Sequence, residues 1–206
     1  FPDVETSHDG VGSMRSGEIG IADAGETTRS TLRTTVAGKG TLTFWWKVNC
    51  EGPDPDYGDL YDYLEFTVDG ERPETVEPIA GDVDWMKVEV RIEGEAPTHE
   101  LAWSFVKDDW DEAPLPDIAW VDELTWTPDP VTVTFDGNGA TEGSVPAAVV
   151  SAAGAELVLP GAGTLRKGPS KFVGWSDGKR VYAAGETYVV GSAGVTLSAV
   201  WEEFTI

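Results

Sequence analysis

Two stretches of the chain concentrate carboxylates among glycine and proline, and their side chains could bind a cation. The first stretch reads EGPDPDYGDLYDYLEF and the second KDDWDEAPLPD. Calcium takes about six to eight hard oxygen ligands, which loops of this composition can supply. Neither stretch has the EF-hand spacing, so a solvated acidic loop is the alternative interpretation. The calcium hypothesis names these ligands: Asp54, Asp56, Asp59, Asp108, Asp109, Asp111 and Asp122.

The same stretches contain Tyr57, Tyr61 and Trp110. Aromatic rings stack on the apolar faces of sugars, while carboxylates accept hydrogen bonds from hydroxyl groups. This pairing of groups is typical of a shallow glycan site or of a protein-binding hot spot. We therefore predict that these three residues bind a ligand.

Asp122 lies in a stretch, DIAWVDELTW, that alternates as a strand does. The alternation places it on the same face as Trp120, Leu124 and Trp126, which we expect to form an apolar face. An inward carboxylate is costly unless it is paired or binds a metal. If Asp122 does not bind calcium, backbone N–H groups or a lysine would have to pair with its carboxylate. Lys47 and Lys107 are the plausible lysines.

Nothing in the sequence indicates catalysis. Cys50 is the one cysteine, and a catalytic thiol would need His8 or His99 as its partner. There is no phosphate-binding glycine loop, no HExxH and no GxSxG. A glycosidase needs two carboxylates roughly 5–9 Å apart, but a domain so rich in acids contains such pairs by chance. We expect the protein not to be an enzyme.

The net charge of −23 is unevenly distributed along the 206 residues. Residues 131–206 hold 7 Asp and Glu against 5 Lys and Arg, so 30 of the 37 acids lie before them. Such a field repels nucleic acid and favours cations or basic partners. No apolar run approaches the roughly 20 residues that span a bilayer, so we expect no membrane insertion in this segment. The first residue is Phe rather than Met, which fits a processed export signal or a trimmed chain.

Period-two patterns dominate and predict a mainly β protein without amphipathic helices. Strands are expected at 17–22, 30–36, 40–49, 63–69, 73–79, 85–93, 98–107 and 118–127. In the third of these, Leu42, Phe44, Trp46 and Val48 share a face, and Trp45 points away from it. About eight strands with turn residues between them favour a two-sheet sandwich of jelly-roll type over residues 1–128.

Thr127-Pro128-Asp129-Pro130 separates this acidic domain from a second one over residues 131–206. Two prolines in three residues end a strand and make a short, stiff connector. In the second domain, Asn138-Gly139 offers the positive φ of a tight turn. Gly174 permits a bulge or a close backbone approach, and Phe172, Trp175 and Trp201 are candidate core residues.

Residues 131–203 resemble the Listeria–Bacteroides repeat, also called the internalin-type B repeat. The matching segments are VTVTFDGNGA, FVGW, YAAGETY and VTLSAVW. The resemblance implies a small β-grasp-like fold on secreted or surface-attached bacterial proteins, with a role in spacing or presentation. It brings no catalytic residues.

The first domain is similar to a jelly-roll domain of bacterial exported proteins, related to cleaved-adhesin and MAM-like domains. SGEIG, STLRTTVAGKGTLTFWWKV, DYLEFTVDG, Trp85, HELAWSFVKD and DIAWVDELTW carry this likeness. It implies adhesion or glycan binding, in some members with structural calcium. No ligand set transfers residue by residue.

These observations predict an extracellular or cell-surface bacterial protein that binds a glycan, or a host or bacterial surface protein, through its first domain. The second domain would serve as a spacer. Two alternatives stay open: an accessory carbohydrate-binding module of a polysaccharide-degrading enzyme, and a passive structural stalk. The ligand, the anchor and the oligomeric state are not indicated by the sequence.

Overall fold

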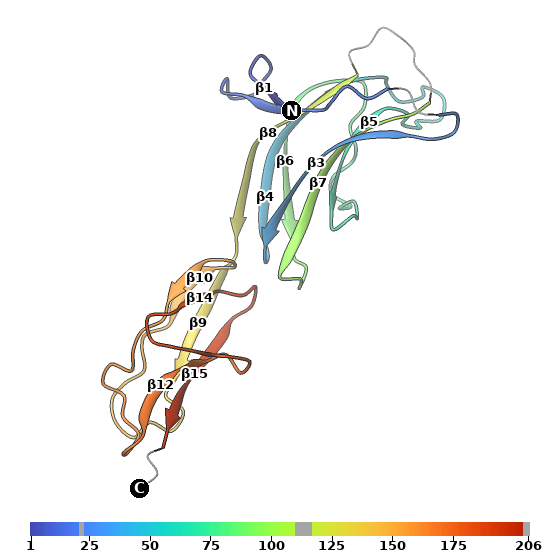
Figure 1. Ribbon diagram of the computed structural model, residues 1–206. Coiled ribbons are helices and arrows are strands. Elements are labelled where there is room, and N and C mark those ends of the chain that lie inside the picture. The colour runs from blue at the N-terminus through green and yellow to red at the C-terminus, as the bar shows by residue number, and fades with distance from the viewer. Residues whose placement is uncertain (21–22, 110–116, 204–206) are drawn as a thin grey trace. The chain divides into compact units, whose positions relative to one another are not determined.

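The computed structural model describes residues 1–20, 23–109 and 117–203, which contain strands and turns but no helix (Figure 1). The mainly β prediction is therefore confirmed. The chain divides into two compact units. The first unit comprises Phe1–Val36, Gly40–Ile92 and His99–Thr127, and the second comprises Ala37–Lys39, Glu93–Thr98 and Pro128–Ile206.

The first unit contains two sheets. The larger sheet has the order β1-β2-β8-β4-β6 and the smaller has the order β3-β7-β5. The larger sheet is built from β1 (Pro2–Asp3), β2 (Ser13–Arg15), β8 (Ile118–Pro128), β4 (Gly40–Asn49) and β6 (Asp82–Ile92). The smaller is built from β3 (Thr28–Ala37), β7 (Thr98–Lys107) and β5 (Tyr63–Val68). This sandwich-like pair encloses one apolar core.

β4 supplies the centre of this core because its residues alternate strictly between the two faces of the sheet. Leu42, Phe44, Trp46 and Val48 are buried, as predicted, while Trp45 lies on the opposite face. The ring of Phe44 meets that of Trp103 edge-on with centroids 5.2 Å apart. Such aromatic contacts add to the stabilisation that area burial provides.

β8 departs from the predicted alternation. Ala119 and Val121 enter the core, whereas Leu124 is 43% exposed. Glu123 adopts a φ of +49°, which interrupts the period of two and moves the next inward position to Trp126. The predicted apolar face of Trp120, Leu124 and Trp126 is therefore wrong, because those residues do not share one face.

Two predicted strands are also absent from the described residues. Residues 17–20 form no strand, and residues 21–22 lie outside the described part of the chain. Residues 73–79 form turns and a single bridge between Ile79 and Leu64. Val76 of this segment is nevertheless 4% exposed and belongs to the core, so its apolar character reflects burial and not strand formation.

The second unit contains a five-stranded sheet of order β10-β9-β15-β12-β13 and a two-stranded sheet of β11 and β14. The strands are β9 (Pro130–Asp136), β10 (Val149–Ala152), β11 (Glu156–Val158), β12 (Lys171–Ser176), β13 (Val181–Tyr182), β14 (Thr187–Val189) and β15 (Val195–Glu202). β9 and β15 are adjacent and parallel, with Leu197 opposite Phe135. The other pairs in this unit are antiparallel.

Trp175 is the centre of the second core. Its side chain is fully buried against Phe135 and Phe172, and its Nε1–H donates to the carbonyl oxygen of Pro160 at 2.8 Å. Phe172 and Trp201 pack against this core but are only partly buried. The predicted core role is thus met fully by Trp175 alone.

Glycine at position 174 is explained by a close backbone approach. A Cβ there would lie 2.1 Å from the carbonyl oxygen of Tyr182, and the register of β12 against β15 shifts between Phe172 and Gly174. Asn138 and Gly139 have φ angles of +46° and +80°, as the turn prediction requires. Both local predictions are confirmed.

Candidate functional site

The carboxylate of Asp54 organises the first acidic loop. Its Oδ1 accepts the backbone N–H groups of Asp56 at 2.7 Å and Tyr57 at 2.9 Å, which forms an Asx turn. The backbone N–H of Tyr57, followed by that of Asp56, lowers the pKa of Asp54 because both bonds favour the ionised form. The loop therefore has a defined conformation despite its high charge.

Tyr61 is fixed by the same carboxylate. Its hydroxyl donates to Oδ2 of Asp54 at 3.0 Å, and this bond raises the pKa of the phenol. The Tyr61 side chain is 37% exposed, and Tyr57, earlier in the same loop, is 84% exposed. Two of the three predicted ligand-binding aromatics thus stand on one loop that Asp54 holds.

An open depression of about 690 Å³ lies beside this loop. Tyr61, Pro53, Asp54, Glu51 and Asp108 line it. The backbone N–H of Asp108 donates to Oδ1 of Asp62 at 3.1 Å, which brings the start of the second acidic stretch to the first. Chemically, the depression combines an aromatic ring with several hydrogen-bond acceptors.

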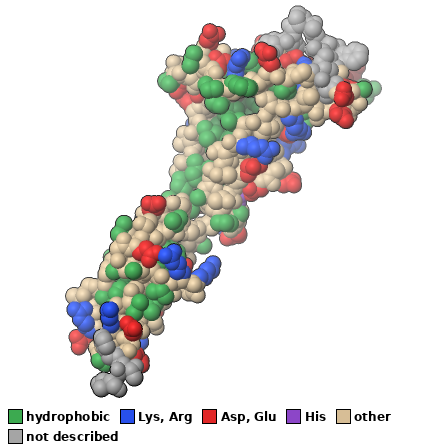
Figure 2. All heavy atoms as spheres, viewed as in Figure 1, with side chains coloured by type: hydrophobic (Ala, Val, Ile, Leu, Met, Phe, Trp, Pro, Cys, Tyr) green, Lys and Arg blue, Asp and Glu red, His purple; other side chains and the backbone are tan. Residues whose placement is uncertain are grey.

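Of the other predicted site residues in the second acidic stretch, the structure describes Asp109 but not Trp110 or Asp111. Asp109 accepts the backbone N–H of Gly25 at 2.6 Å through its Oδ2. Trp110 and Asp111 lie outside the described residues. Figure 2 shows acidic side chains spread over the visible face of the first unit and not gathered at one place.

The predicted calcium ligands do not form a metal-binding group of side chains in the described part of the chain. No group of three or more His, Cys, Asp or Glu side chains within residues 1–20, 23–109 and 117–203 is placed to hold a metal ion. Asp54 already uses both oxygens on the loop, at Asp56, Tyr57 and Tyr61. Asp56 and Asp59 lie in the same loop as Asp54, but the three carboxylates are not placed to hold a metal ion together with any other described residue.

Asp122 is buried, with 7% exposure, and is bound by backbone groups. Its Oδ2 accepts the N–H of His8 and its Oδ1 that of Glu123, both at 2.7 Å. Of the two lysines considered from the sequence, Lys47 pairs with Asp84 and Lys107 with Asp62. The backbone alternative therefore accounts for this inward carboxylate.

The interior of the first unit also holds a cysteine and an ion pair. Lys107 lies 3.4 Å from Oδ2 of Asp62 and also pairs with Asp117. Burial is the largest cause of the raised pKa of Asp62, and burial raises the pKa of the Cys50 thiol to about 12. At neutral pH Cys50 is therefore a protonated core residue and a poor nucleophile.

The outer face of the larger sheet carries an aromatic cluster that sequence reasoning only partly found. The imidazole of His8 stacks on the indole of Trp45 with ring centroids 3.6 Å apart, and Trp85 lies edge-on to His8 at 6.1 Å. The outward alternation of Trp45 was visible in the sequence. The placement of His8 and Trp85 was not, because it depends on the pairing of β4 with β6 and on the backbone bond from His8 to Asp122.

Comparison with known proteins found no matching protein-family model and no curated protein with significant similarity. The two family resemblances read from the sequence therefore stay predictions. No helix that is long and apolar enough to span a bilayer occurs among the described residues.

Proposed function

We propose that the protein is a non-enzymatic, exported bacterial surface protein of the adhesin type. Its first unit binds a glycan at the Asp54–Tyr61 loop, and its second unit acts as a spacer. The observation that carries the glycan proposal is the hydrogen bond from Tyr61 to Asp54, which holds a part-exposed aromatic ring beside a depression lined with carboxylates.

The arrangement suits a sugar for two reasons. The ring of Tyr61 in the depression, together with that of Tyr57 on the same loop, can stack on the apolar face of a pyranose. The carboxylates of Glu51 and Asp108 can accept hydrogen bonds from its hydroxyl groups. The Asx turn at Asp54 fixes the loop before binding, so less conformational entropy is lost when a ligand arrives. Trp110, predicted as a third aromatic contact, follows directly after Asp109 in the sequence.

The spacer proposal draws support from the second unit. Its parallel central pair, β9 and β15, lies between antiparallel neighbours, a strand arrangement that suits the proposed β-grasp-like repeat. The jelly-roll assignment of the first unit draws similar support from its two facing sheets. The acidic charge of the first unit adds a preference for basic over acidic protein partners, should the ligand be a protein.

A glycan array with the full chain tests the site. Tyr57→Ala removes an 84% exposed ring without disturbing the core and should weaken binding by at least about tenfold, and Trp110→Ala should abolish it. Trp45→Ala, on the outer face of the larger sheet, is the matched control and should bind as the unaltered chain does. If Trp45→Ala loses binding and Tyr57→Ala keeps it, the loop assignment is wrong.

Two further results would contradict the proposal as a whole. A chain that binds nothing in saturating screens of glycans and surface proteins is a passive stalk. A native gene context that shows a polysaccharide-degrading catalytic neighbour indicates an accessory module of an enzyme instead.

Structural calcium in the acidic loops is proposed as a stabiliser and not as a catalyst. An ion that binds only the folded state raises the melting temperature. Calcium should therefore raise the melting temperature of the chain, and EDTA should lower it. Identical melting curves in calcium and EDTA would remove calcium from the proposal and leave the glycan site untouched.

A further inference from the structure

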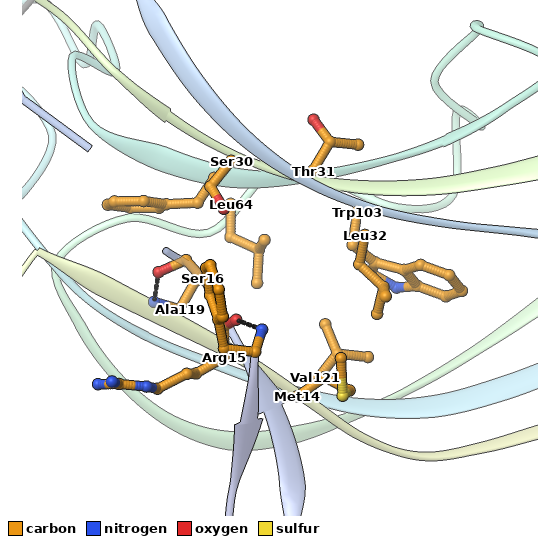
Figure 3. Close-up of a pocket in the computed structure, with 12 residues that line it drawn as sticks. Met14, Arg15, Ser16, Ser30, Thr31, Leu32, Leu64, Trp103, Ala119 and Val121 are labelled. Atoms are coloured by element: carbon orange, nitrogen blue, oxygen red, sulfur yellow. Dashed lines mark hydrogen bonds between the residues drawn. The ribbon is translucent and has the colours of Figure 1, made fainter. Parts of the chain in front are cut away.

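The first unit buries charged side chains although its interior is mostly apolar. Figure 3 shows the apolar part at a cavity of about 210 Å³ beside Trp103, which Leu32, Leu64 and Val121 also line. Elsewhere in the unit, at the end of β7, the side chains of Lys107 and Asp62 are only 4% and 2% exposed. Ions buried this completely are costly unless each has a partner.

The amine of Lys107 also contacts the carboxylate of Asp117. Nζ of Lys107 is hydrogen-bonded to Oδ2 of Asp117, so the carboxyl carbon Cγ is one covalent bond from the atom that Nζ touches. Asp117 has a φ of +37°, which residues other than glycine rarely adopt and which the surrounding structure must hold. An amine nitrogen and a carboxyl carbon are thus held together between the end of β7 and the start of β8.

Two other lysines that pair with carboxylates are more accessible to water. The side chains of Lys39 and Glu95 are 32% and 86% exposed, and those of Lys47 and Asp84 are 23% and 86% exposed. Water competes with the carboxylate for such ammonium groups. Asp117, by contrast, is 19% exposed. Of these three pairs, that of Lys107 with Asp117 is therefore the one from which water is largely excluded.

Asp62 is a third group in contact with the same amine. Its Oδ2 lies 3.4 Å from Nζ of Lys107, and its Oδ1 accepts the backbone N–H of Asp108 at 3.1 Å, which fixes the carboxyl group. Burial is the largest cause of the raised pKa of Asp62, so this carboxyl group holds a proton more readily than an exposed one does. It can therefore take a proton from the ammonium group and pass it on.

We propose that Lys107 and Asp117 condense to an isopeptide bond, an amide between Nζ and Cγ, and that Asp62 relays the protons. Asp62 first takes one proton from the ammonium group, and the freed lone pair of Nζ attacks Cγ of Asp117. The Nζ–Cγ bond forms and the bond from Cγ to one carboxylate oxygen breaks. That oxygen leaves as water with two of the three ammonium protons. Nothing is oxidised or reduced, and Asp62 ends with the protons it had at the start.

Two features of the site favour the condensation. Well-aligned groups in one molecule react as if at effective concentrations of up to about 10⁵–10⁸ M. The reaction also replaces an ion pair in a water-poor interior by a neutral amide, which is less costly to bury. The ion pair is the unreacted state of these groups, and a chain that does not react keeps it.

The bond would join the two sheets of the first unit covalently, because Lys107 ends β7 and Asp117 directly precedes β8. It would also close residues 107–117 into a covalent ring that includes Trp110. Like a disulfide, it would stabilise the fold mainly by restricting the unfolded chain. The proposed glycan binding does not depend on this bond, so either proposal can fail without the other.

Intact-mass spectrometry of the denatured full chain tests the proposal. We expect a mass lower than that of the sequence by one water molecule. Trypsin should then fail to cut after Lys107, and cleavage after Glu112 should leave the two flanking pieces joined to each other. A chain with the full mass of its sequence would overturn the proposal.

Matched lysine variants show whether Lys107 is the residue that reacts. Lys107→Arg keeps a cation beside both carboxylates but should retain the full mass, because a guanidinium group is a poor nucleophile. Lys47→Arg alters the exposed pair with Asp84 and should lose water as the unaltered chain does. A loss of water that persists in Lys107→Arg, as from a succinimide at an Asp-Gly sequence, would contradict the assignment.

Two carboxylate variants test the other partners. Asp117→Asn should react with release of ammonia and reach the same mass as the linked unaltered chain, which identifies Cγ of residue 117 as the carbon attacked. Asp62→Asn should leave most of the chain at full mass, because the proton relay is missing. If Asp117→Asn does not react, the carbon attacked is a different one. If Asp62→Asn is linked as completely as the unaltered chain, Asp62 is not the relay.

Discussion

The ammonium group of Lys107 lies 3.4 Å from Oδ2 of Asp62, and both side chains are buried, with exposures of 4% and 2%. Lys107 also pairs with Asp117, whose side chain is 19% exposed. One cation thus neutralises two carboxylates at one end of β7. The first unit carries this charged group inside an otherwise apolar interior because each charge has a partner.

Replacing the cation should therefore be severe. We expect Lys107→Met to lower the free energy of unfolding by about 3–5 kcal/mol, because it leaves Asp62 buried without its counter-charge. Lys47→Met, which breaks the exposed pair with Asp84, should cost less than about 1 kcal/mol. Urea unfolding of both variants at pH 7 measures this difference, and equal losses would contradict it.

The stability lost in Lys107→Met should depend on pH, and the direction follows from the pKa of Asp62. Burial raises the pKa of Asp62 in the folded protein, so on acidification the folded state takes up this proton before the unfolded state does. The unfavourable contribution of Asp62 is present above its folded pKa and fades below it. The deficit of Lys107→Met should therefore shrink as the pH falls from 7 towards 4.

The thiol of Cys50 should be unreactive in the folded chain. Its pKa of about 12 leaves roughly one thiol in ten thousand ionised at pH 8, and the side chain is 3% exposed. Iodoacetamide should label Cys50 only at the rate of unfolding, and rapidly once guanidinium is added. Complete labelling of the native protein within minutes, observed by mass spectrometry, would show that Cys50 is accessible.

Gly174→Ala should destabilise the second unit. The added methyl group would meet the carbonyl oxygen of Tyr182 at 2.1 Å, so the backbone must shift, at an expected cost of about 1–3 kcal/mol. Gly191→Ala is the control, because no atom lies within 4 Å of the added methyl group there. Thermal unfolding should separate the two variants clearly. A stable Gly174→Ala chain would mean that β12 and β13 do not approach so closely.

Asp177 should make the second unit sensitive to acid. Its carboxylate accepts the backbone N–H groups of Arg180 and Lys179, each at 2.8 Å, and these bonds lower its pKa. Its stabilising effect is thus present above the unfolded pKa of about 3.9 and is lost as the pH falls through the lower folded pKa.

Asp177→Asn should accordingly unfold more easily than the unaltered chain at pH 6, and the two should converge near pH 2. The Trp175 indole resonance reports on this unit during denaturation. Glu202→Gln, at an exposed site at the end of β15, serves as the control and should follow the unaltered chain throughout. A gap that stays constant with pH would contradict the role given to Asp177.

Alternation along single strands was the part of the fold that sequence could predict. The buried positions of β4 and the outward position of Trp45 follow from a period of two. The same reasoning failed in β8, because the positive φ of Glu123 is a conformation that glutamate rarely adopts and that no local pattern signals. It failed again at Val76, where a buried apolar residue belongs to a turn.

In the candidate site, too, local interactions could be predicted from the sequence and long-range contacts could not. The Asx turn at Asp54 is a local interaction over three residues, and an Asp-rich loop with proline is a recognisable signal for it. The contact between His8 and Trp45, and the cavity beside Trp103, join segments far apart in the chain. They depend on how the strands pair, which composition and spacing do not determine.

The adjacent, parallel strands β9 and β15 also bear on how the second unit responds to force. β9 is its first strand and β15 its last, so their outer ends lie at opposite ends of the shared ladder. Tension applied along the polypeptide would load these hydrogen bonds in shear, and they would have to rupture together. Pulling apart the two ends of a hairpin breaks its bonds one after another, so the β9–β15 ladder forms a mechanical clamp.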